Sequence, residues 1–190
     1  MSTRPDARQR LLDAGEELFA AEGFAATPVD RVLARAQVAP ATLYAHFGSK
    51  TGLQEAVLTV RLARWDAVWA RAVAGAADDR GRLLAVFDAF DDFRTGGPPS
   101  RWCAFLDAAA GAPSDDPTAS AAITADTTLL RDRLTALAEP VAGPRAAELA
   151  EHLLLVVSGA LAMALRSDGA SATVQGRGTA AALVAAYSGG

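Results

Sequence analysis

The chain has few of the residues from which catalytic and metal sites are built. Its 190 residues include one cysteine and two histidines. The single Cys103 excludes an intramolecular disulfide, and with the distant His46 and His152 it makes no metal-ligand cluster. No Ser-His-Asp order, phosphate-binding glycine loop or carboxylate pair stands out. We therefore expect no metal, no cofactor and no enzymatic activity, and we interpret Cys103 as a small core residue and His152 as a satisfied core histidine.

Long apolar runs and targeting segments are also missing. The start of the chain, residues 1–6, has no apolar stretch of the kind found in signal peptides. The longest apolar run, from Leu153 to Leu165, contains Ser158 and Gly159 and is shorter than the about 20 residues that a membrane-spanning helix needs. The sequence thus predicts a cytoplasmic protein that does not enter a membrane.

Strand patterns are absent as well, and the hydrophobic residues are spaced as in helices. Hydrophobic residues make up 51% of the chain, and no run of alternating β-branched residues occurs. Between breaks rich in Gly and Pro, the segments have helical periodicity. This pattern predicts an all-α protein of about nine helices.

Charge is modest in total but unevenly distributed. Residues 1–64 carry eight Lys or Arg and seven Asp or Glu, and residues 65–190 carry ten and fifteen, so the net charge of −4 divides into +1 and −5. The N-terminal part is therefore the one that could meet a polyanion, through few phosphates, beside an acidic partner domain.

The N-terminal part contains clear helix boundaries. A first helix is expected from about Arg4 to Glu22, and Gly23 suits the positive φ that often follows a helix. Thr27 is expected to cap a second helix, with Pro28 as its first residue. A third helix begins at Pro40, and Ser49 is expected to cap a long fourth helix that reaches about Ala74.

The segment from Thr42 to Lys50 has the pattern of a recognition helix. Leu43 and Phe47 are four residues apart and should pack inward, while Thr42, Tyr44 and His46 should face outward. A polar and aromatic face without an acid, followed by Lys50, suits a phosphate backbone. The alternatives remain that Tyr44 is a half-buried packing residue and that His46 is an ordinary surface histidine.

Residues 8–58 closely resemble the DNA-binding domain of the tetracycline-repressor (TetR) family of bacterial transcription regulators. The resemblance implies a helix-turn-helix domain over residues 1–52 and a helical ligand-binding and dimerisation domain over residues 53–190. By resemblance, the positions that mostly touch phosphates are Thr27, Thr42, Tyr44, His46 and Lys50.

Further DNA contacts are expected at the start of the recognition helix and on the helix before it. In helix-turn-helix proteins the first residues of the recognition helix reach base edges, which here are Pro40, Ala41 and Thr42. Arg31, on the exposed side of the second helix, would add a phosphate or base contact.

Three positions depart from the family pattern. Gln37 stands where the turn usually has Gly, at a cost of roughly 1 kcal/mol if φ is positive. Ala39 replaces a common capping Ser, which removes another ~1 kcal/mol. Gly52 replaces a Glu often found near the start of the fourth helix. We expect these changes to affect the rigidity of the helix-turn-helix domain, which is called the reading head below.

The remaining helices contain a group of large apolar residues that could line a ligand pocket or form ordinary core. The group consists of Phe87, Phe90, Trp102, Phe105 and Leu130. Asp91 and Asp107 lie nearby in sequence and no Lys does, so an apolar or cationic effector is expected. The alternative is that Arg94 and Arg101, which flank the same helices, point inward and invert this preference.

The last two helices are rich in small residues, which allow helices to approach closely. In the family these helices form a four-helix interface between two subunits, and the resemblance implies the same here. The expected interface residues are Gly159, Ala160, Met163, Ala181, Leu183 and Val184.

The sequence therefore predicts a homodimeric one-component transcription regulator. Its partners would be double-stranded operator DNA and a small-molecule effector, and it would be a repressor that the effector releases. The alternative is a ligand carrier or interaction protein of the same fold whose reading head no longer binds DNA specifically, an alternative that Gln37 and Ala39 favour.

Overall fold

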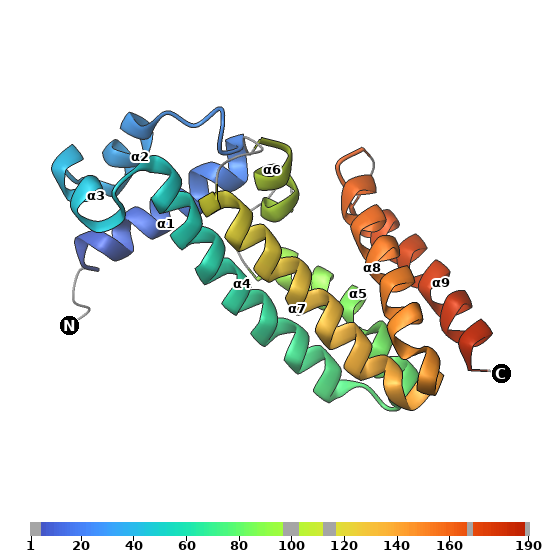
Figure 1. The fold of residues 1–190 in the computed structure, drawn as a ribbon. Helices are drawn as coiled ribbons and strands as arrows, with labels where there is room; N and C mark the ends of the chain where they lie inside the picture. Colours follow the sequence, from blue (N-terminus) through green and yellow to red (C-terminus); the bar gives the residue numbers. More distant parts are fainter. Residues whose placement is uncertain (1–4, 97–102, 112–116, 167–168, 189–190) are drawn as a thin grey trace. The chain divides into compact units, whose positions relative to one another are not determined.

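The computed structural model describes residues 5–96, 103–111, 117–166 and 169–188, with backbone only at residues 117–120. Within these ranges the chain is all-α, which confirms the predicted fold class (Figure 1). The helices are α1 (Ala7–Glu22), α2 (Val29–Ala36), α3 (Pro40–Phe47), α4 (Lys50–Gly75), α5 (Asp79–Thr95), α6 (Ala104–Gly111), α7 (Pro117–Ala142), the short 3-10 helix η1 (Gly143–Arg145), α8 (Ala146–Met163) and α9 (Gly169–Tyr187).

The chain divides into two compact units. The first comprises Met1–Ala63 and Pro98–Thr124, and the second comprises Arg64–Gly97 and Ala125–Gly190. α4 and α7 each contribute to both units, and α6 belongs to the first. The predicted boundary after residue 52 divides the chain into a DNA-binding part and a ligand-binding part, and this functional division stays a prediction.

Local chemistry explains where the N-terminal helices begin and end. The carboxylate of Asp6 accepts a hydrogen bond from the Gln9 N–H at 2.7 Å and caps α1. Gly23 ends α1 with φ of 86°, and its N–H donates to the Phe19 carbonyl, as the sequence predicted. Ser49 caps α4, because its Oγ accepts from the Gly52 N–H at 2.9 Å.

The first unit is built around leucine and valine side chains from α1, α2, α3 and α4. Leu11, Val32, Leu43 and Leu53, one from each helix, are all fully buried in a single cluster. Burying each such side chain contributes about 1.5–3 kcal/mol. The position of α3 is therefore fixed by the same core that holds the other three helices.

α6 is joined to the first unit by apolar and polar contacts. Phe105 and Ala108 pack with Leu58 of α4 and Ala122 of α7. Cys103 packs against this cluster and is partly buried, as expected of a small core residue. The Asp107 carboxylate also accepts a hydrogen bond from the Phe24 N–H at 3.1 Å, across 83 residues of sequence.

In the second unit, a glycine allows α9 to approach α5 and α8 closely. A Cβ added at Gly176 would lie 2.8 Å from the Ala160 Cβ and 2.9 Å from the Phe87 ring. Any side chain at this position would force the helices apart. Gly176 therefore explains why a glycine-rich segment forms a core helix here.

One helical stretch, Ala121–Met163, contains a window apolar enough to cross a membrane by length and composition. Several of its apolar side chains face the protein interior, since Leu134, Leu149, Leu153 and Val157 are at most 1% exposed. A core helix of this composition passes the same test.

Candidate nucleic-acid interface

α3 presents a nearly continuous exposed face. Its inner side is anchored by the fully buried Leu43 and the half-buried Phe47. Tyr44 is 54% exposed and is not among the residues of the core cluster that Leu43 and Phe47 join. His46 is also exposed, which both of its interpretations expected. The other exposed residues of α3 are Pro40, Ala41 and Ala45, and Thr42 is partly exposed.

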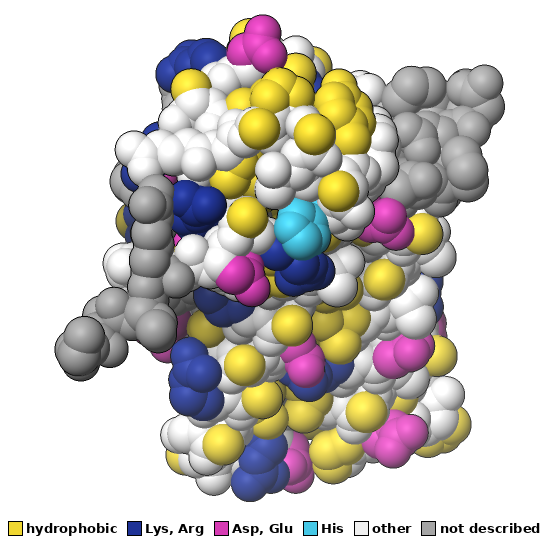
Figure 2. Space-filling view, turned by 90° about the vertical axis from the view of Figure 1, so that its left-hand side faces the viewer, with side chains coloured by type: hydrophobic (Ala, Val, Ile, Leu, Met, Phe, Trp, Pro, Cys, Tyr) yellow, Lys and Arg dark blue, Asp and Glu magenta, His cyan; other side chains and the backbone are white. Residues whose placement is uncertain are grey.

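The exposed face of α3 carries no acidic side chain. In the space-filling view that faces the α3 end of the chain, hydrophobic and uncharged side chains occupy much of the upper surface, with Lys and Arg side chains beside them and a few Asp and Glu side chains around its margin (Figure 2). Such a surface can approach a duplex without burying a carboxylate against a phosphate.

The turn between α2 and α3 contains two of the predicted departures. Gln37 has φ of 54° and ψ of 54°, the one non-glycine positive φ within the ranges that the structure describes. Ala39 takes the capping position of α3 without a side-chain hydrogen bond, and Pro40 follows as the first helical residue. The turn keeps its geometry although both residues are poorly suited to it.

Gly52 has a steric reason that the sequence did not reveal. A Cβ at this position would lie 2.0 Å from the Phe47 carbonyl oxygen, far inside van der Waals contact. Only glycine permits α4 to begin this close to the end of α3. The residue therefore fixes the connection between these helices.

Thr27 has a different role from the one predicted. It is fully buried, and its hydroxyl donates to the Gly23 carbonyl at 2.7 Å. Its N–H donates to the Phe24 carbonyl at 3.3 Å. It therefore satisfies carbonyls of the connection between α1 and α2 and does not cap α2, whose capping residue is Pro28. Its side chain cannot reach a phosphate from this position.

Lys50 is engaged within the protein. Its ammonium donates to the Phe24 carbonyl at 2.7 Å and lies 4.1 Å from the centroid of the Phe24 ring. Partial burial lowers the pKa of Lys50. An ammonium group has three donors, so a phosphate contact remains a prediction, but the first task of Lys50 is to join α4 to the α1–α2 connection.

Most other cations of the first unit are paired with carboxylates. Arg31 Nη1 lies 2.7 Å from Glu22 Oε2, and Arg35 Nη2 lies 2.6 Å from Glu17 Oε2. Arg31 remains exposed, so its predicted DNA contact stays a prediction, which would require competition with Glu22.

The second unit contains an aromatic cluster that the sequence predicted only in part. Trp65 and Trp69 of α4 lie 5.8 Å apart, and Trp65 stacks on Phe90 of α5 at 4.7 Å. Phe87 and Phe93 of α5 complete the cluster through edge contacts. The spacing of four between Trp65 and Trp69 is the signal that could have assigned them.

The five residues predicted to line a pocket do not all belong to this cluster. Phe105 lies in the first unit and packs with Leu58 and Ala108, which corrects its assignment. Trp102 lies outside the described residues. Leu130 is buried on α7 in the second unit.

Two polar side chains of the second unit are largely withdrawn from water, one fully buried and the other half-buried. Trp69 is fully buried, and no hydrogen-bond acceptor for its Nε1 is found among the described residues. Asp126 lies on the same face of α7 as the buried Leu130 and Leu134, and burial raises its pKa to about 6. A buried donor without an acceptor and a half-buried acid are groups that a ligand could satisfy.

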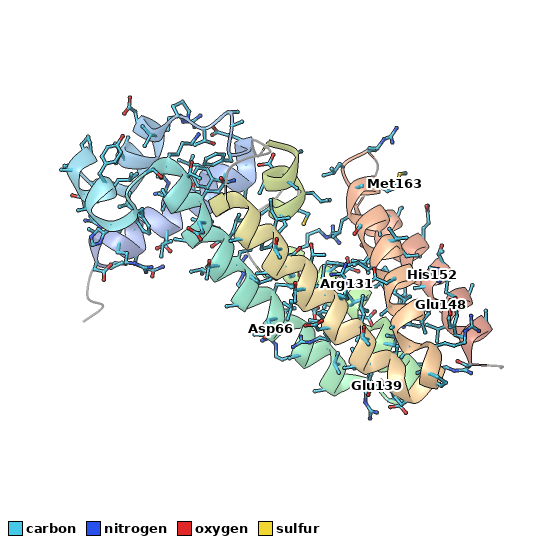
Figure 3. The ribbon with its side chains drawn as sticks, in the orientation of Figure 1. Asp66, Arg131, Glu139, Glu148, His152 and Met163 are labelled. Carbon is cyan, nitrogen blue, oxygen red and sulfur yellow. The ribbon has the colours of Figure 1, made fainter. Side chains whose placement is uncertain are left out.

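The predicted interface residues of α8 and α9 separate into two groups. Ala160 and Val184 are buried inside the chain at 9% and 2% exposure, so they are not free to meet a partner. Gly159 and Met163 are exposed, and Ala181 and Leu183 are partly exposed. Met163 lies towards the end of α8 (Figure 3).

The sequence missed the more exposed apolar residues of these two helices. Leu155 of α8 is 71% exposed, and Val174 of α9 is 69% exposed. Leu155 lies four residues before Gly159, and Val174 lies seven residues before Ala181, so each falls on the same side of its helix as a predicted interface residue.

His152 is exposed and hydrogen-bonded, which corrects its assignment to the core. Its Nδ1 lies 2.9 Å from the Tyr187 hydroxyl. The Arg145 guanidinium lies 4.0 Å from the centroid of the Tyr187 ring and also pairs with Glu148. Glu148 and His152 lie one turn apart on α8 (Figure 3).

Comparison with known proteins gives consistent results. The family model "Bacterial regulatory proteins, tetR family" matches residues 11–57. The chain is 37% identical over 90 residues to the HTH-type transcriptional activator FasR of Mycolicibacterium smegmatis, covering 47% of this chain and 41% of FasR. It is 36% identical over 101 residues to the HTH-type transcriptional regulator BetI of Burkholderia cenocepacia, covering 52% of each. The match thus spans about half the length of these curated relatives.

A likeness over nearly the whole chain comes from solved structures. A TetR-family transcriptional regulator from Streptomyces coelicolor superposes with a TM-score of 0.85 and 28% identity, covering 96% of each chain. The reduced form of NemR from E. coli shares the fold alone, with a TM-score of 0.76 and 19% identity over 94% of this chain and 98% of NemR.

Proposed function

Because the chain belongs to the tetR family of bacterial regulatory proteins, we propose that it is a DNA-binding transcription regulator whose recognition helix is α3. The observation that carries the proposal is the exposed face of α3. Tyr44 on this face is 54% exposed, and α3 contains no acidic residue. Tyr44 lies outside the core cluster to which Leu43 and Phe47 attach this short helix. It suits contact with a sugar-phosphate backbone.

The base-reading part of this surface is the start of α3. Pro40 and Ala41 are exposed there and Thr42 is partly exposed, so sequence preference rests on apolar contact and one hydroxyl. Tyr44 and His46 lie farther along the helix, where phosphates are the expected partners. Lys50 adds to them only if its ammonium keeps the Phe24 carbonyl and reaches a phosphate with another N–H.

The regulator acts as a homodimer formed through α8 and α9. Leu155, Val174 and Met163 are exposed large hydrophobic residues on these two helices, and covering them would contribute favourably. Leu155→Arg is expected to shift the protein towards monomer in sedimentation, while Ala147→Arg, at an exposed position of the same helix, should not. An intact Leu155→Arg dimer would contradict this interface.

The second unit binds the effector. The aromatic cluster of Trp65, Trp69, Phe87 and Phe90, together with the half-buried Asp126, favours an apolar molecule or a cation with apolar groups. Arg94 does not argue against a cation, because it pairs with Asp91 at 2.9 Å. The effector releases DNA by favouring a subunit arrangement that no longer fits the operator, since a ligand shifts an equilibrium only through differential affinity.

A mobility-shift assay with the DNA that flanks its own gene tests the proposal. Specific binding that an excess of unrelated duplex does not remove is expected, with half-sites about one helical turn apart. A purified, folded dimer that prefers no flanking sequence would favour the carrier protein of the same fold. In that case Gln37 and Ala39 would be marks of a reading head that has lost its function.

A further inference from the structure

The cations of the first unit differ in whether a carboxylate already neutralises their charge. Six Arg or Lys side chains of the first unit lie within the described residues: Arg8, Arg10, Arg31, Arg35, Lys50 and Arg61. Three of them pair with glutamates, and Lys50 donates to a backbone carbonyl. A phosphate that approached a paired arginine would be repelled by the glutamate or would have to displace it.

Arg8 has no carboxylate partner among the described residues. The two acids nearest to it in sequence are bonded elsewhere, because Asp6 accepts from the Gln9 N–H and Asp13 accepts from the Gln9 side-chain amide at 2.8 Å. Arg8 is exposed, so its charge faces water. It keeps a full positive charge that a polyanion could use.

The guanidinium of Arg8 is held beside α3. It lies 5.6 Å from the centroid of the Phe47 ring, and Phe47 is the last residue of α3, next to His46. A cation–π contact orients the guanidinium but leaves its charge in place, whereas a salt bridge orients the guanidinium and also neutralises its charge. Part of the entropy cost of ordering the long side chain is thus already met before DNA arrives.

Helix stability does not explain a cation at this position. Arg8 is the second residue of α1, and the first turn of α1 contains no acid. A positive charge near a helix N-terminus is unfavourable by about 0.3–1 kcal/mol. Lys50 also has no carboxylate partner among the described residues, but its ammonium donates to the Phe24 carbonyl. Arg10 is the third such cation, and it is only partly exposed with its Nε buried. Two residues along a helix it points to the opposite side.

We propose that Arg8 of α1 is a DNA-phosphate contact of the reading head, oriented by Phe47 beside the end of α3. The inference rests on the proposed function and adds a residue that neither the recognition helix nor the family resemblance assigned. A phosphate contact acts on every sequence alike and is measured by its salt dependence. The test therefore needs no known operator.

The test measures the affinity of the full-length protein for a 30-base-pair mixed-sequence duplex between 0.03 and 0.3 M NaCl. Removing one phosphate contact lowers the slope of log K against log salt by about 0.9 per subunit, and at 0.1 M salt this weakens binding by about eightfold per contact. We expect Arg8→Ala to show both effects and Arg8→Lys, which retains the charge, to keep most of the slope.

Arg35→Ala is the matched control. It removes the same charge from the same unit, but at an arginine already paired with Glu17, and its slope should stay within about 0.3 of the wild-type value. Thermal unfolding of each variant checks that the fold is retained. Equal slope losses in Arg8→Ala and Arg35→Ala would overturn the distinction between paired and unpaired cations.

An Arg8→Ala variant with the wild-type slope would overturn the inference and leave the proposed function standing. A wild-type protein that binds no duplex at low salt would overturn both. A loss of affinity in Arg8→Ala with no change of slope would also count against it, because a phosphate contact cannot be lost without a change of salt dependence.

Discussion

The first unit joins its helices through side-chain hydrogen bonds to the backbone, whereas the second unit buries an indole N–H that has no acceptor within the described ranges and withdraws a carboxyl from water. In the first, Thr27 donates to the Gly23 carbonyl, Lys50 donates to the Phe24 carbonyl, and Asp107 accepts from the Phe24 N–H. In the second, Trp69 Nε1 has no acceptor among the described residues, and partial burial raises the pKa of the Asp126 carboxyl. Arg10 Nε is the exception in the first unit.

This difference matches two different tasks. A surface that reads a duplex must hold several side chains in one register, and hydrogen bonds to fixed carbonyls provide that rigidity. An isolated buried donor costs about 1–3 kcal/mol and lowers stability unless something binds it. The second unit therefore retains groups whose cost a ligand can remove, while the first has few. The four changes below test this contrast, in order of decreasing effect.

The largest effect is expected from a charge placed on the exposed face of α3. Ala41→Asp should weaken operator binding by more than about 100-fold, because a carboxylate at the base edges meets phosphate repulsion and loses water. The fold should be unchanged, since Ala41 is exposed. Titration by mobility shift measures the loss. Ala70→Asp, at an exposed position of α4, is the control and should bind normally. Normal binding by Ala41→Asp would show that α3 does not enter the groove.

How much of this surface the sequence could predict depends on the distance between the residues that form it. The turn before Pro40, the inward Leu43 and the exposed Tyr44 follow from helical spacing alone, and all three were predicted. The bond from Lys50 to Phe24 and the contact of Arg8 with Phe47 join residues 26 and 39 positions apart. They depend on how the helices approach one another, which periodicity does not contain.

The predicted interior of the second unit shows the same limit. Aromatic residues of α5 were correctly interpreted as a cluster, but Phe105 belongs to the first unit because α6 packs on α4 at Leu58. Small residues of α8 and α9 indicated close packing, yet the side chains that pack, Ala160 and Val184, do so within one chain. Composition predicts that helices approach closely and leaves open which helices do so.

The next effect concerns the buried acid of the second unit. The pKa of Asp126 is raised to about 6, above its value of about 3.9 in an unfolded chain. A folded state that holds the proton more tightly is favoured below pH 4, and this contribution is lost as the pH rises through 6. Asp126→Asn should therefore raise the free energy of unfolding at pH 7.5 by about 1–3 kcal/mol. Denaturant unfolding at pH 4 and pH 7.5 measures it.

The pH dependence separates this explanation from a general stabilisation. The advantage of Asp126→Asn should be largely lost at pH 4, where wild-type Asp126 is protonated in the folded state and about half protonated in the unfolded chain. Asp132→Asn, at an exposed position of the same helix, should change stability little at either pH. An Asp126→Asn variant that is less stable than wild type at pH 7.5 would indicate that the carboxylate has a partner in solution, and the contrast between the units would lose its best support.

A smaller effect is expected from deleting the unpaired indole N–H. Trp69→Phe leaves a cavity, which is destabilising at about 24 cal/mol per Å³, but it also removes an unsatisfied donor. The two terms should nearly cancel, for a change below about 1 kcal/mol. Trp65→Phe does not remove an unsatisfied donor, so nothing compensates for its cavity. It also loses the stacking on Phe90 at 4.7 Å, and it should be destabilising by about 1–2 kcal/mol. Thermal unfolding of both variants decides, and a more costly Trp69→Phe would show that Nε1 is hydrogen-bonded.

The smallest effects are expected in the turn of the reading head, where the first unit does carry strain. Gln37 has φ of 54°, and α3 begins at Ala39 without a side-chain cap. Gln37→Gly should raise the free energy of unfolding by about 1 kcal/mol or less, because glycine adopts positive φ freely but also gains entropy in the unfolded chain. Ala39→Ser should add about 0.5–1 kcal/mol through a new hydrogen bond to an N–H of the first turn of α3. Ala34→Ser, at an exposed position of α2, is the control and should not stabilise the protein.

If both changes stabilise the protein while the affinity for DNA is unchanged, the turn was already rigid in the wild type. If they also tighten binding, the uncapped turn costs the reading head part of its order.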